Sequence, residues 1–420
     1  MVTLTGMNIY LIIILVAMIG NYLLNLLSDW LNVNNLRQEL PAEFEGYYDA
    51  EKYAESQRYL RDNTKFGIVQ STFNLLVVLA MILAGGFDLV DQWARTADLG
   101  PILTGIIFTG ILILGSMILG LPFSIYDTFV IEERYGFNKT TPKTFVLDQL
   151  KALLLTLLIG MPVLAAILWF FGATGGMAWI YCWIALTAFQ IFIMFIAPVV
   201  IMPLFNKFEP LEEGELKTAI EDYAQKENFK LKGVYTMDGS KRSSKSNAFF
   251  TGFGRFRRIV LFDTLIEKHT VDELVSILAH EMGHFKKKHI LMAIVRSIIT
   301  LGITFYILSL FIKNPELFAA FQMTGDPTIY ASLIFFGFLY IPIQFVISIA
   351  ENAISRRQEY QADRYAVETY SKPNAMIEAL KKLSCDNLSN LTPHPLTVFL
   401  KYSHPPVLKR IDSIRNRDRK

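Results

Sequence analysis

The sequence predicts a mainly α-helical protein that crosses a membrane several times and carries a soluble domain with a small β-sheet. The chain of 420 residues is 52% hydrophobic and has a mean hydropathy of +0.35, which is too apolar for an ordinary soluble globule. Several apolar runs reach the length of about 20 residues that a helix needs to cross a bilayer. The segment 203–289 is instead polar and mixes helix-like with strand-like patterns. These observations together predict a membrane bundle joined to a soluble domain.

Seven apolar segments are long enough to span the membrane. They lie near residues 9–27, 66–87, 102–121, 152–171, 177–202, 290–311 and 329–350. No Lys or Arg precedes the first segment, so we expect a membrane helix there and not a signal peptide. The expected organisation is 1–202 for five membrane helices with their loops and 290–350 for two more. Residues 203–289 and 351–420 would form the two parts of one soluble domain.

Lys and Arg are distributed unevenly among the loops. They crowd the loops after the first and third spans, the segment after the fifth span and the C-terminal tail, while the alternate loops hold only Arg95 and Lys313. The positive-inside rule therefore predicts an outside N-terminus, with the soluble domain and the C-terminus in the cytoplasm. The membrane would be the inner membrane of a bacterial cell, or the endoplasmic reticulum or nuclear membrane of a eukaryotic one. The net charge of +2 says nothing about partners, and no basic tract suggests nucleic acid as one.

The soluble segment has a readable order of elements. Its pattern predicts a helix at 214–228 and strands at 232–237, 248–252 and 258–262. Thr270 and Glu273 then form a capping box ahead of apolar residues at helical spacing, so a second helix begins there. We expect this helix to continue through residues 286–288 into the sixth span. Cys182 and Cys385 are too few for a disulfide framework.

That second helix carries the motif His-Glu-Met-Gly-His at residues 280–284. Positions i and i+4 of a helix share one face, so His280 and His284 can both reach one Zn²⁺ about 2 Å away. Glu281 would then lie beside the open coordination position, where it can take a proton from water. A surface helix with incidental histidines is the alternative interpretation, and the helical context disfavours it.

A hydrolytic zinc site needs a third protein ligand, and Glu359 is the best candidate. Asp363 lies four residues further on the same predicted helix face, where it can accept the second N–H of a ligand histidine. Two acidic residues at this spacing more often lie on a solvated helix face. Because this chain also carries the motif at 280–284, metal binding is the favoured interpretation. His289 would lie about 140° round a continuous helix from His284. We therefore expect His289 to be a membrane-interface residue outside the site.

The motif at 280–284 with Ser355-Arg356-x-x-Glu359-x-x-Ala362-Asp363 resembles the type I CAAX prenyl endopeptidases, a family of integral-membrane zinc metalloproteases. Four further blocks of the chain are similar to that family: 121–126 (LPFSIY), 132–139 (EERYGFNK), 201–207 (IMPLFNK) and 402–406 (YSHPP). The resemblance implies a gluzincin-like protease domain with one Zn²⁺ per chain, and seven helices that enclose a polar, water-filled chamber. It also implies endopeptidase activity near the C-terminus of prenylated CaaX substrates.

The resemblance assigns two further roles. His404, in the His-Pro block, would stabilise the tetrahedral oxyanion, a contribution of about 3 kcal/mol. A structural histidine before a Pro-Pro turn is the alternative, and His394 is a weaker candidate for the role. Asn247, Ala248, Phe249 and Phe250 would form an edge strand that binds the substrate backbone; an ordinary hairpin strand is the other interpretation. The expected partners are a peptide or protein substrate and the bilayer, and we expect a monomer.

Arg296 lies well inside the sixth span, where an ionisable group normally faces a polar interior. We expect it in a hydrated cavity continuous with the metal site, with a snorkelling interface Arg as the alternative and Glu351 as a plain interface residue. Three other functions compete. A membrane quality-control zinc protease would have a shorter, four-span pattern, and a site-two-type protease would carry the motif inside an apolar span. A channel, transporter or scaffold on an inactive protease fold is the third.

Overall fold

The computed structural model describes residues 8–37, 39–251 and 258–418. Six of its helical segments are long and apolar enough to cross a membrane, and a bent pair of helices makes up a seventh. This agrees with the seven predicted spans, although most segments extend further than predicted. The single-helix segments are Ile9–Asn34 (α1), Ala50–Leu83 (α2) and His289–Phe311 (α11), and the bent pair is Ile329–Leu339 (α13) with Ile341–Tyr370 (α14). The composite segments are Gly100–Glu132, which begins with α4 (Gly100–Tyr126), Pro142–Ala173, which holds α5 (Pro142–Leu155) and α6 (Met161–Ala173), and Gly175–Leu204, which holds α7 (Ala178–Ile196).

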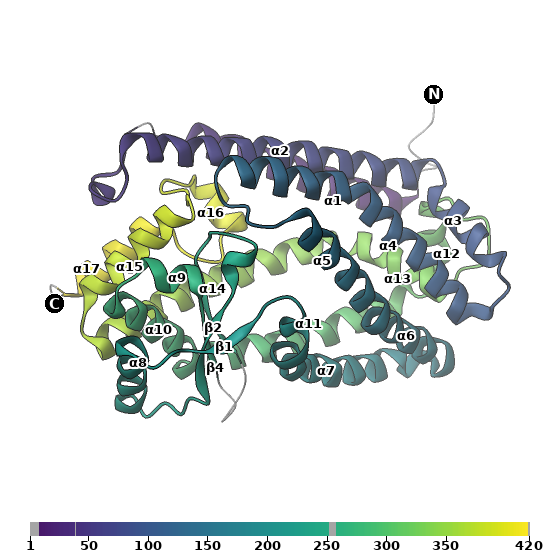
Figure 1. Cartoon of the computed structure of the whole chain (residues 1–420). Helices are drawn as coiled ribbons and strands as arrows, with labels where there is room; N and C mark the ends of the chain where they lie inside the picture. Colours follow the sequence, from purple (N-terminus) through teal and green to yellow (C-terminus); the bar gives the residue numbers. More distant parts are fainter. Residues whose placement is uncertain (1–7, 38, 252–257, 419–420) are drawn as a thin grey trace.

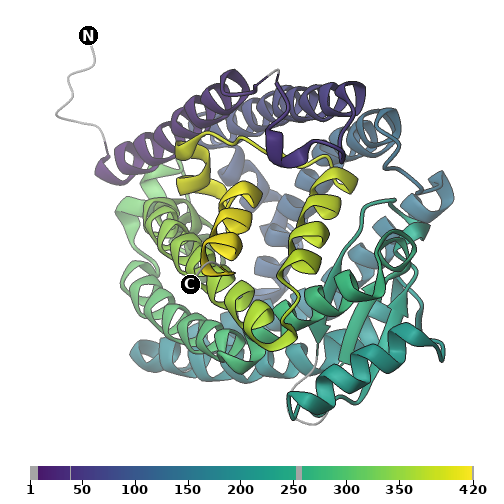
Figure 2. The same cartoon turned by 90° about the vertical axis from the view of Figure 1, so that its left-hand side faces the viewer.

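The membrane helices form a closed ring. Contacts run from α1 to α2, on to α4 through its end at Asp127–Glu132, and then through α6, α7, α11 and α13 back to α1. Figure 2 shows this ring from the side of the soluble domain. Between 0% and 22% of the most apolar stretch of each of the six single spans is buried. The helices therefore pack along narrow seams and leave most of their surface free.

The seventh span bends by 54° between α13 and α14. Pro342 stands at the start of α14, where a proline is tolerated because its missing N–H has no helical partner to lose. Beyond residue 350, α14 leaves the bundle and packs against the helices of the soluble domain. The helix α14 thus runs without a break from the membrane to Glu359, one of the three predicted metal ligands.

The soluble domain is a four-stranded sheet with helices around it. The strand order is β1–β2–β4–β3, with β2 and β4 parallel and the other two pairs antiparallel. The predicted strands are confirmed, except that Gly252 lies outside the described residues, and the three-residue strand β1 was not predicted. The strands are Phe208–Pro210 (β1), Gly233–Met237 (β2), Ala248–Thr251 (β3) and Arg258–Phe262 (β4). The helices are Glu215–Lys226 (α8), Asp263–Lys268 (α9), Val271–Lys286 (α10), Pro373–Asp386 (α15), Pro395–Lys401 (α16) and Val407–Asp418 (α17).

The helix α10 forms the centre of this domain. Its capping box between Thr270 and Glu273 is present as predicted. Leu274, Leu278 and Met282 are buried in the main apolar core of the domain, which α8, β2 and β4 complete. The prediction that this helix continues into the membrane was wrong. α10 ends at Lys286, Lys288 adopts a left-handed conformation with φ of 59°, and α11 starts anew at His289.

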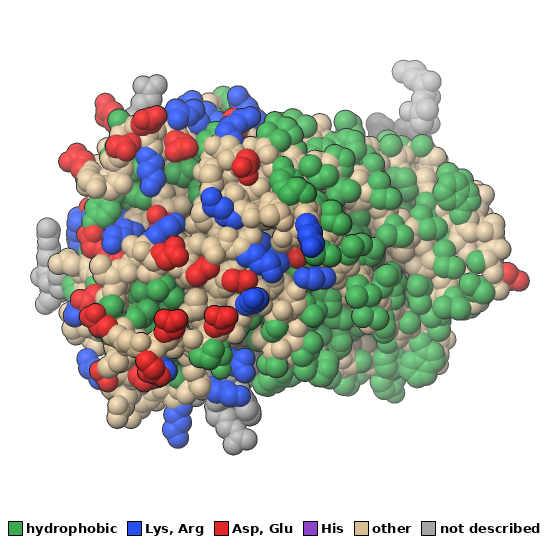
Figure 3. Space-filling view, viewed as in Figure 1, with side chains coloured by type: hydrophobic (Ala, Val, Ile, Leu, Met, Phe, Trp, Pro, Cys, Tyr) green, Lys and Arg blue, Asp and Glu red, His purple; other side chains and the backbone are tan. Residues whose placement is uncertain are grey.

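Two short helices, Gly86–Arg95 (α3) and Pro315–Ala320 (α12), close the end of the bundle opposite the soluble domain (Figure 1). The helix α1 runs from this cap, where Asn8 donates to the Glu316 carbonyl, to α16, where Ser28 pairs with Thr397. The two ends differ sharply in chemistry. In Figure 3, Lys, Arg, Asp and Glu gather over the soluble domain, and apolar side chains cover the visible face of the bundle. The first helix therefore starts on the side opposite the soluble domain.

Candidate active site

The site lies where α10 crosses α14, and Gly283 makes this crossing close. A Cβ atom built on Gly283 would be 3.0 Å from the Cα of Ala362 and 3.1 Å from the Cβ of Tyr365. The absence of a side chain at Gly283 therefore lets the two helices approach closely. The crossing sets His280 and His284 on α10 opposite Glu359, which lies one turn before Ala362 on α14.

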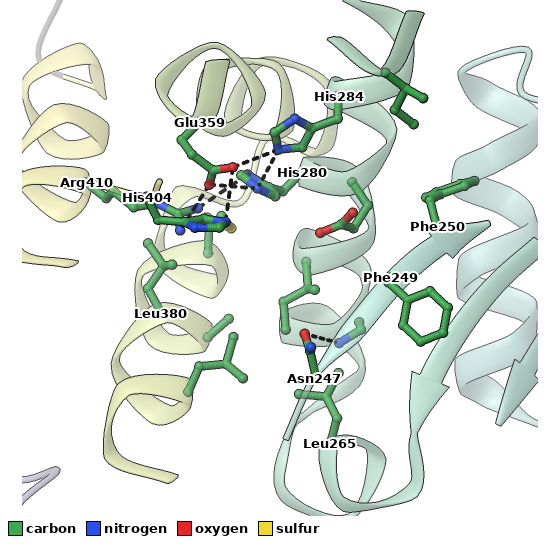
Figure 4. Close-up of a pocket in the computed structure, with 17 residues that line it drawn as sticks. Asn247, Phe249, Phe250, Leu265, His280, His284, Glu359, Leu380, His404 and Arg410 are labelled. Atoms are coloured by element: carbon green, nitrogen blue, oxygen red, sulfur yellow. Dashed lines mark hydrogen bonds and ion pairs between the residues drawn. The ribbon is translucent and has the colours of Figure 1, made fainter. Parts of the chain in front are cut away.

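His280, His284 and Glu359 converge on one point, as the sequence predicts (Figure 4). The Nε2 atoms of the two histidines are 3.2 Å apart, and they lie 3.4 and 3.1 Å from the two oxygens of Glu359. Ligand atoms about 2.0–2.1 Å from a zinc ion at tetrahedral angles lie about 3.3 Å from one another. The Oε2 atom of Glu359 is buried and has no hydrogen-bond partner among the described residues. The three side chains therefore fit a tetrahedral metal ion.

A second layer of contacts holds these groups in place. The Nδ1 atom of His280 lies 2.8 Å from Asp363, so the carboxylate can accept its proton and leave Nε2 free for a metal. Arg410 on α17 donates two hydrogen bonds to Asp363, at 2.6 and 2.8 Å, and lies 3.5 Å from Glu359. Asp363 thus lies where the sequence analysis placed it. Arg410 was missed, because no local pattern marks an arginine on a helix remote from the motif.

The charges in the site stabilise one another. Burial by itself raises the pKa of Glu359, but the close contacts with His280 and His284 and the charge of Arg410 lower it far below its ordinary value. Burial acts in the same direction on Asp363, and Arg410 and His280 lower its pKa to about 2. Burial lowers the pKa of His280, while hydrogen bonds to Asp363 and Glu359 outweigh it and raise the pKa to about 9. Both carboxylates are therefore anionic at neutral pH, which suits Glu359 as a ligand of a cation and Asp363 as the acceptor of the His280 proton.

The whole chain, beyond this site, is similar to known membrane peptidases. Residues 29–207 match the family model "CAAX prenyl protease N-terminal, five membrane helices", and residues 210–418 match "Peptidase family M48". The "CAAX prenyl protease 1 homolog" of Oryza sativa subsp. japonica is 36% identical over 391 residues, which cover 91% of each chain. The "CAAX prenyl protease 1" of Saccharomyces cerevisiae is 36% identical over 90% of this chain and 88% of the relative.

A solved structure with a similar sequence identity has the same fold. The crystal structure of Ste24p from S. mikatae superimposes with a TM-score of 0.92 at 33% identity, over 96% of this chain and 99% of that one. The chain belongs to peptidase family M48. It is an integral-membrane metalloprotease, and the resemblance predicted from its motifs is confirmed. A membrane quality-control protease would have a shorter pattern of four spans, and the described residues hold six candidate spans, or seven with the bent pair.

A pocket opens beside the metal-binding group in this M48 protease. Its volume is about 380 Å³, and Glu281, His404 and Arg410 line it together with the three predicted metal ligands. The side chain of His404 is 64% exposed, and its Nε2 lies 3.4 Å from Glu359. His394 caps α16 instead, by accepting from the Leu396 N–H, and is not among the residues that line this pocket. The geometry therefore favours His404 over His394 as the second polar group of the site.

The strand β3 forms another wall of the pocket and an edge of the sheet. It pairs with β4 on one side and with no other described strand on the second side. Asn247, Ala248, Phe249 and Phe250 all line the pocket. The carbonyl of Asn247 accepts from Phe262 in β4, whereas the N–H of Ala248 donates to the side chain of Asn247 at 2.8 Å. Backbone groups alternate in direction along a strand, so the Ala248 groups point to the free edge.

Two sequence predictions near the site were wrong. His289 is a buried residue and not an interface residue, and its Nδ1 lies 3.1 Å from the Nδ1 of His284. The break after α10 changes the direction of the chain, so the angle expected for a continuous helix does not apply. Glu351 is not a plain interface residue either: it accepts from Arg296 at 3.1 Å, between α14 and α11. Arg296 therefore has a charged partner, and the hydrated cavity expected around it stays a prediction.

Proposed function

We propose that this M48 protease is a zinc endopeptidase that cleaves near the C-terminus of CaaX-type, prenylated substrates. The observation that carries the proposal is the tetrahedral spacing of 3.1 to 3.4 Å among the facing atoms of His280, His284 and Glu359. Their neighbour Glu281 lines the same pocket. A bound zinc ion supplies polarisation of the scissile carbonyl and acidifies water to a pKa of about 7.

Each side chain around the pocket has one task in this proposal. Glu281 accepts the proton of the attacking water and later donates it to the leaving amine. His404 donates to the carbonyl oxygen as negative charge develops on it, which is worth about 3 kcal/mol. Asp363 holds the proton of His280 on Nδ1, and Arg410 keeps Asp363 ionised and in place. Arg410 also brings a positive charge to a pocket that will hold the negative charge of the transition state.

The substrate backbone lies along the free edge of β3 as an added strand. Ala248 offers its N–H and carbonyl toward that edge, and Asn247 covers the N–H through its own side chain. We infer that the substrate carbonyl replaces the Asn247 oxygen on binding. Leu265, Ile277, Met376, Leu380 and Leu383 form the apolar part of the pocket lining. These side chains suit the aliphatic residues of a CaaX sequence.

We further propose that the ring of membrane helices encloses a hydrated chamber open to the metal site. The closed ring of contacts supports it, and so does the ion pair of Arg296 and Glu351, whose side chains remain 27% and 43% exposed. The soluble domain and C-terminus would face the cytoplasm, as the loop charges indicate. Every group named for catalysis comes from one chain, so a monomer suffices.

The test is cleavage by purified protein in detergent, with product mapping by mass spectrometry. The wild type is incubated with a farnesylated CaaX peptide and the same peptide without the lipid, and Glu281→Gln serves as the matched variant. We expect cleavage next to the modified cysteine, a preference for the farnesylated peptide, and a rate reduced about 10²- to 10⁴-fold in Glu281→Gln. Metal analysis should find one zinc per chain, and none in Glu359→Ala.

The outcomes separate the parts of the proposal. Equal cleavage rates for Glu281→Gln and the wild type would refute the role of Glu281 as the proton acceptor. Full zinc occupancy in Glu359→Ala would refute the assignment of Glu359 as a metal ligand. Equal cleavage of both peptides would show that the enzyme does not require the prenyl group, and it would still support the peptidase activity. Absence of cleavage in every case, with zinc bound, would favour a scaffold on a protease fold.

A further inference from the structure

The turn between α10 and α11 has an unusual backbone conformation, which determines where His289 lies. Lys288 has φ of 59° and ψ of 27°, the left-handed region that residues with a side chain rarely adopt. Because α11 begins directly after this residue, His289 points back toward α10. The ring centroids of His284 and His289 are 5.1 Å apart at an angle of 74°. The turn therefore places the buried imidazole of His289 against the ring of His284, on the side of Nδ1.

A chain of hydrogen bonds runs from His284 through His289 to α14. The Nδ1 atoms of the two histidines lie 3.1 Å apart, and Nε2 of His289 lies 2.9 Å from Oε1 of Gln361. His289 is only 3% exposed, so neither nitrogen has free access to water. Gln361 lies two residues after Glu359 on α14. The chain thus ties the His284 ring to the helix that carries the third ligand.

The proton positions in this chain follow from the metal-binding geometry. His284 turns Nε2 toward His280 and Glu359, and a nitrogen that binds a metal cannot carry a proton. The neutral His284 ring therefore has its proton on Nδ1 and donates it to Nδ1 of His289. His289 must in turn carry its proton on Nε2, where the Gln361 oxygen accepts it. Each donor meets an acceptor, so only one arrangement of protons satisfies all three residues.

We propose that His289, held by Gln361, is a positioning residue that fixes the tautomer and ring orientation of His284 for metal binding. The inference rests on the proposed zinc site and extends it. His280 has the same support from Asp363, so each ligand histidine has its own partner on its far nitrogen. The partner of His284 is neutral, and it therefore orients the ring without adding another negative charge to the site.

The experiment compares two substitutions of His289 with side chains of similar shape, one ending in an amide and the other in two methyl groups. Asn can place its side-chain oxygen close to where Nδ1 of His289 lies, whereas Leu fills the space without an acceptor. Zinc affinity is measured by competition with a chelator, and the visible absorption of the Co²⁺-loaded protein reports the ligand geometry. We expect His289→Leu to lose zinc affinity about 10- to 100-fold and to alter the Co²⁺ spectrum. His289→Asn should remain within a few fold of the wild type.

Two further variants guard against a purely structural explanation. His269→Leu removes another buried histidine, bonded to Glu273 at the start of α10, and should lower the melting temperature without changing zinc affinity. Gln361→Leu should weaken zinc several-fold in the wild type and have no added effect in His289→Leu. Wild-type zinc affinity in His289→Leu, or an equal loss in His289→Asn and His289→Leu, would overturn the inference. A wild-type protein that binds no zinc would instead refute the proposed site itself.

Discussion

Gly283→Ala is the substitution whose effect the structure defines most closely. The added Cβ would lie 3.0 Å from Cα and 3.1 Å from the carbonyl oxygen of Ala362, and 3.1 Å from Cβ of Tyr365. Ordinary contacts of a Cβ begin at 3.4 Å, and these neighbours cannot rotate away because they belong to the backbone or its first side-chain atom. The helix α14 must therefore move away from α10 by a few tenths of an ångström.

That movement acts directly on the metal site, because Glu359 lies one turn from Ala362 on the same helix. Metal–ligand distances tolerate changes of about 0.2 Å. Overpacking of this kind costs about 1–3 kcal/mol. The metal-free protein can relax this strain by separating the helices, whereas the zinc-bound protein cannot. We therefore expect zinc affinity to fall about 5- to 150-fold, which corresponds to that energy.

Zinc affinity is measured by chelator competition in detergent, together with the melting temperature of the metal-free protein. Gly67→Ala on α2 is the matched control, because its Cβ would meet no atom within 4 Å. It should leave zinc binding unchanged and gain up to about 1 kcal/mol of stability from the higher helix propensity of alanine. Zinc binding within twofold of the wild type in Gly283→Ala would refute the idea that this glycine sets the ligand spacing.

Three further substitutions test other contacts. Asp363→Ala should weaken zinc binding about 10- to 100-fold. It should also destabilise the fold by about 3 kcal/mol, because the buried Arg410 loses both of its hydrogen bonds to Asp363 and keeps only the longer contact with Glu359. An unchanged zinc affinity in chelator competition would contradict the first expectation. Ala248→Pro removes an N–H from the free edge of β3 and should raise KM in the peptide assay while zinc content stays at wild-type level. Loss of zinc there would indicate a folding defect. Arg296→Met should lower the melting temperature by the equivalent of about 1 kcal/mol, because Glu351 loses its ion-pair partner. The double substitution Arg296→Met and Glu351→Gln should restore the melting temperature. No restoration would show that loss of the ion pair is not the cause.

Local patterns were sufficient for the membrane spans, for many elements of the soluble domain and for the three side chains that converge in the candidate metal site. The capping box at Thr270 and the helical spacing after it predicted α10, and apolar length predicted the spans. His280 and His284 follow from a four-residue spacing on that helix, which is a local property. Glu359 lies 75 positions beyond His284 in the chain, yet its spacing to Asp363 on one helix face still marked it. These predictions depend on helix periodicity, which the sequence displays directly.

The remaining features depend on how helices meet. Arg410 reaches Asp363 only because α17 packs against α14, and no pattern around Arg410 records that contact. His289 was placed on the wrong side because one residue, Lys288, adopts a left-handed backbone that is rare for lysine. Periodicity determined which side chains share a helix face. Tertiary packing decided which faces meet and where a helix breaks, because both depend on contacts between residues far apart in the chain.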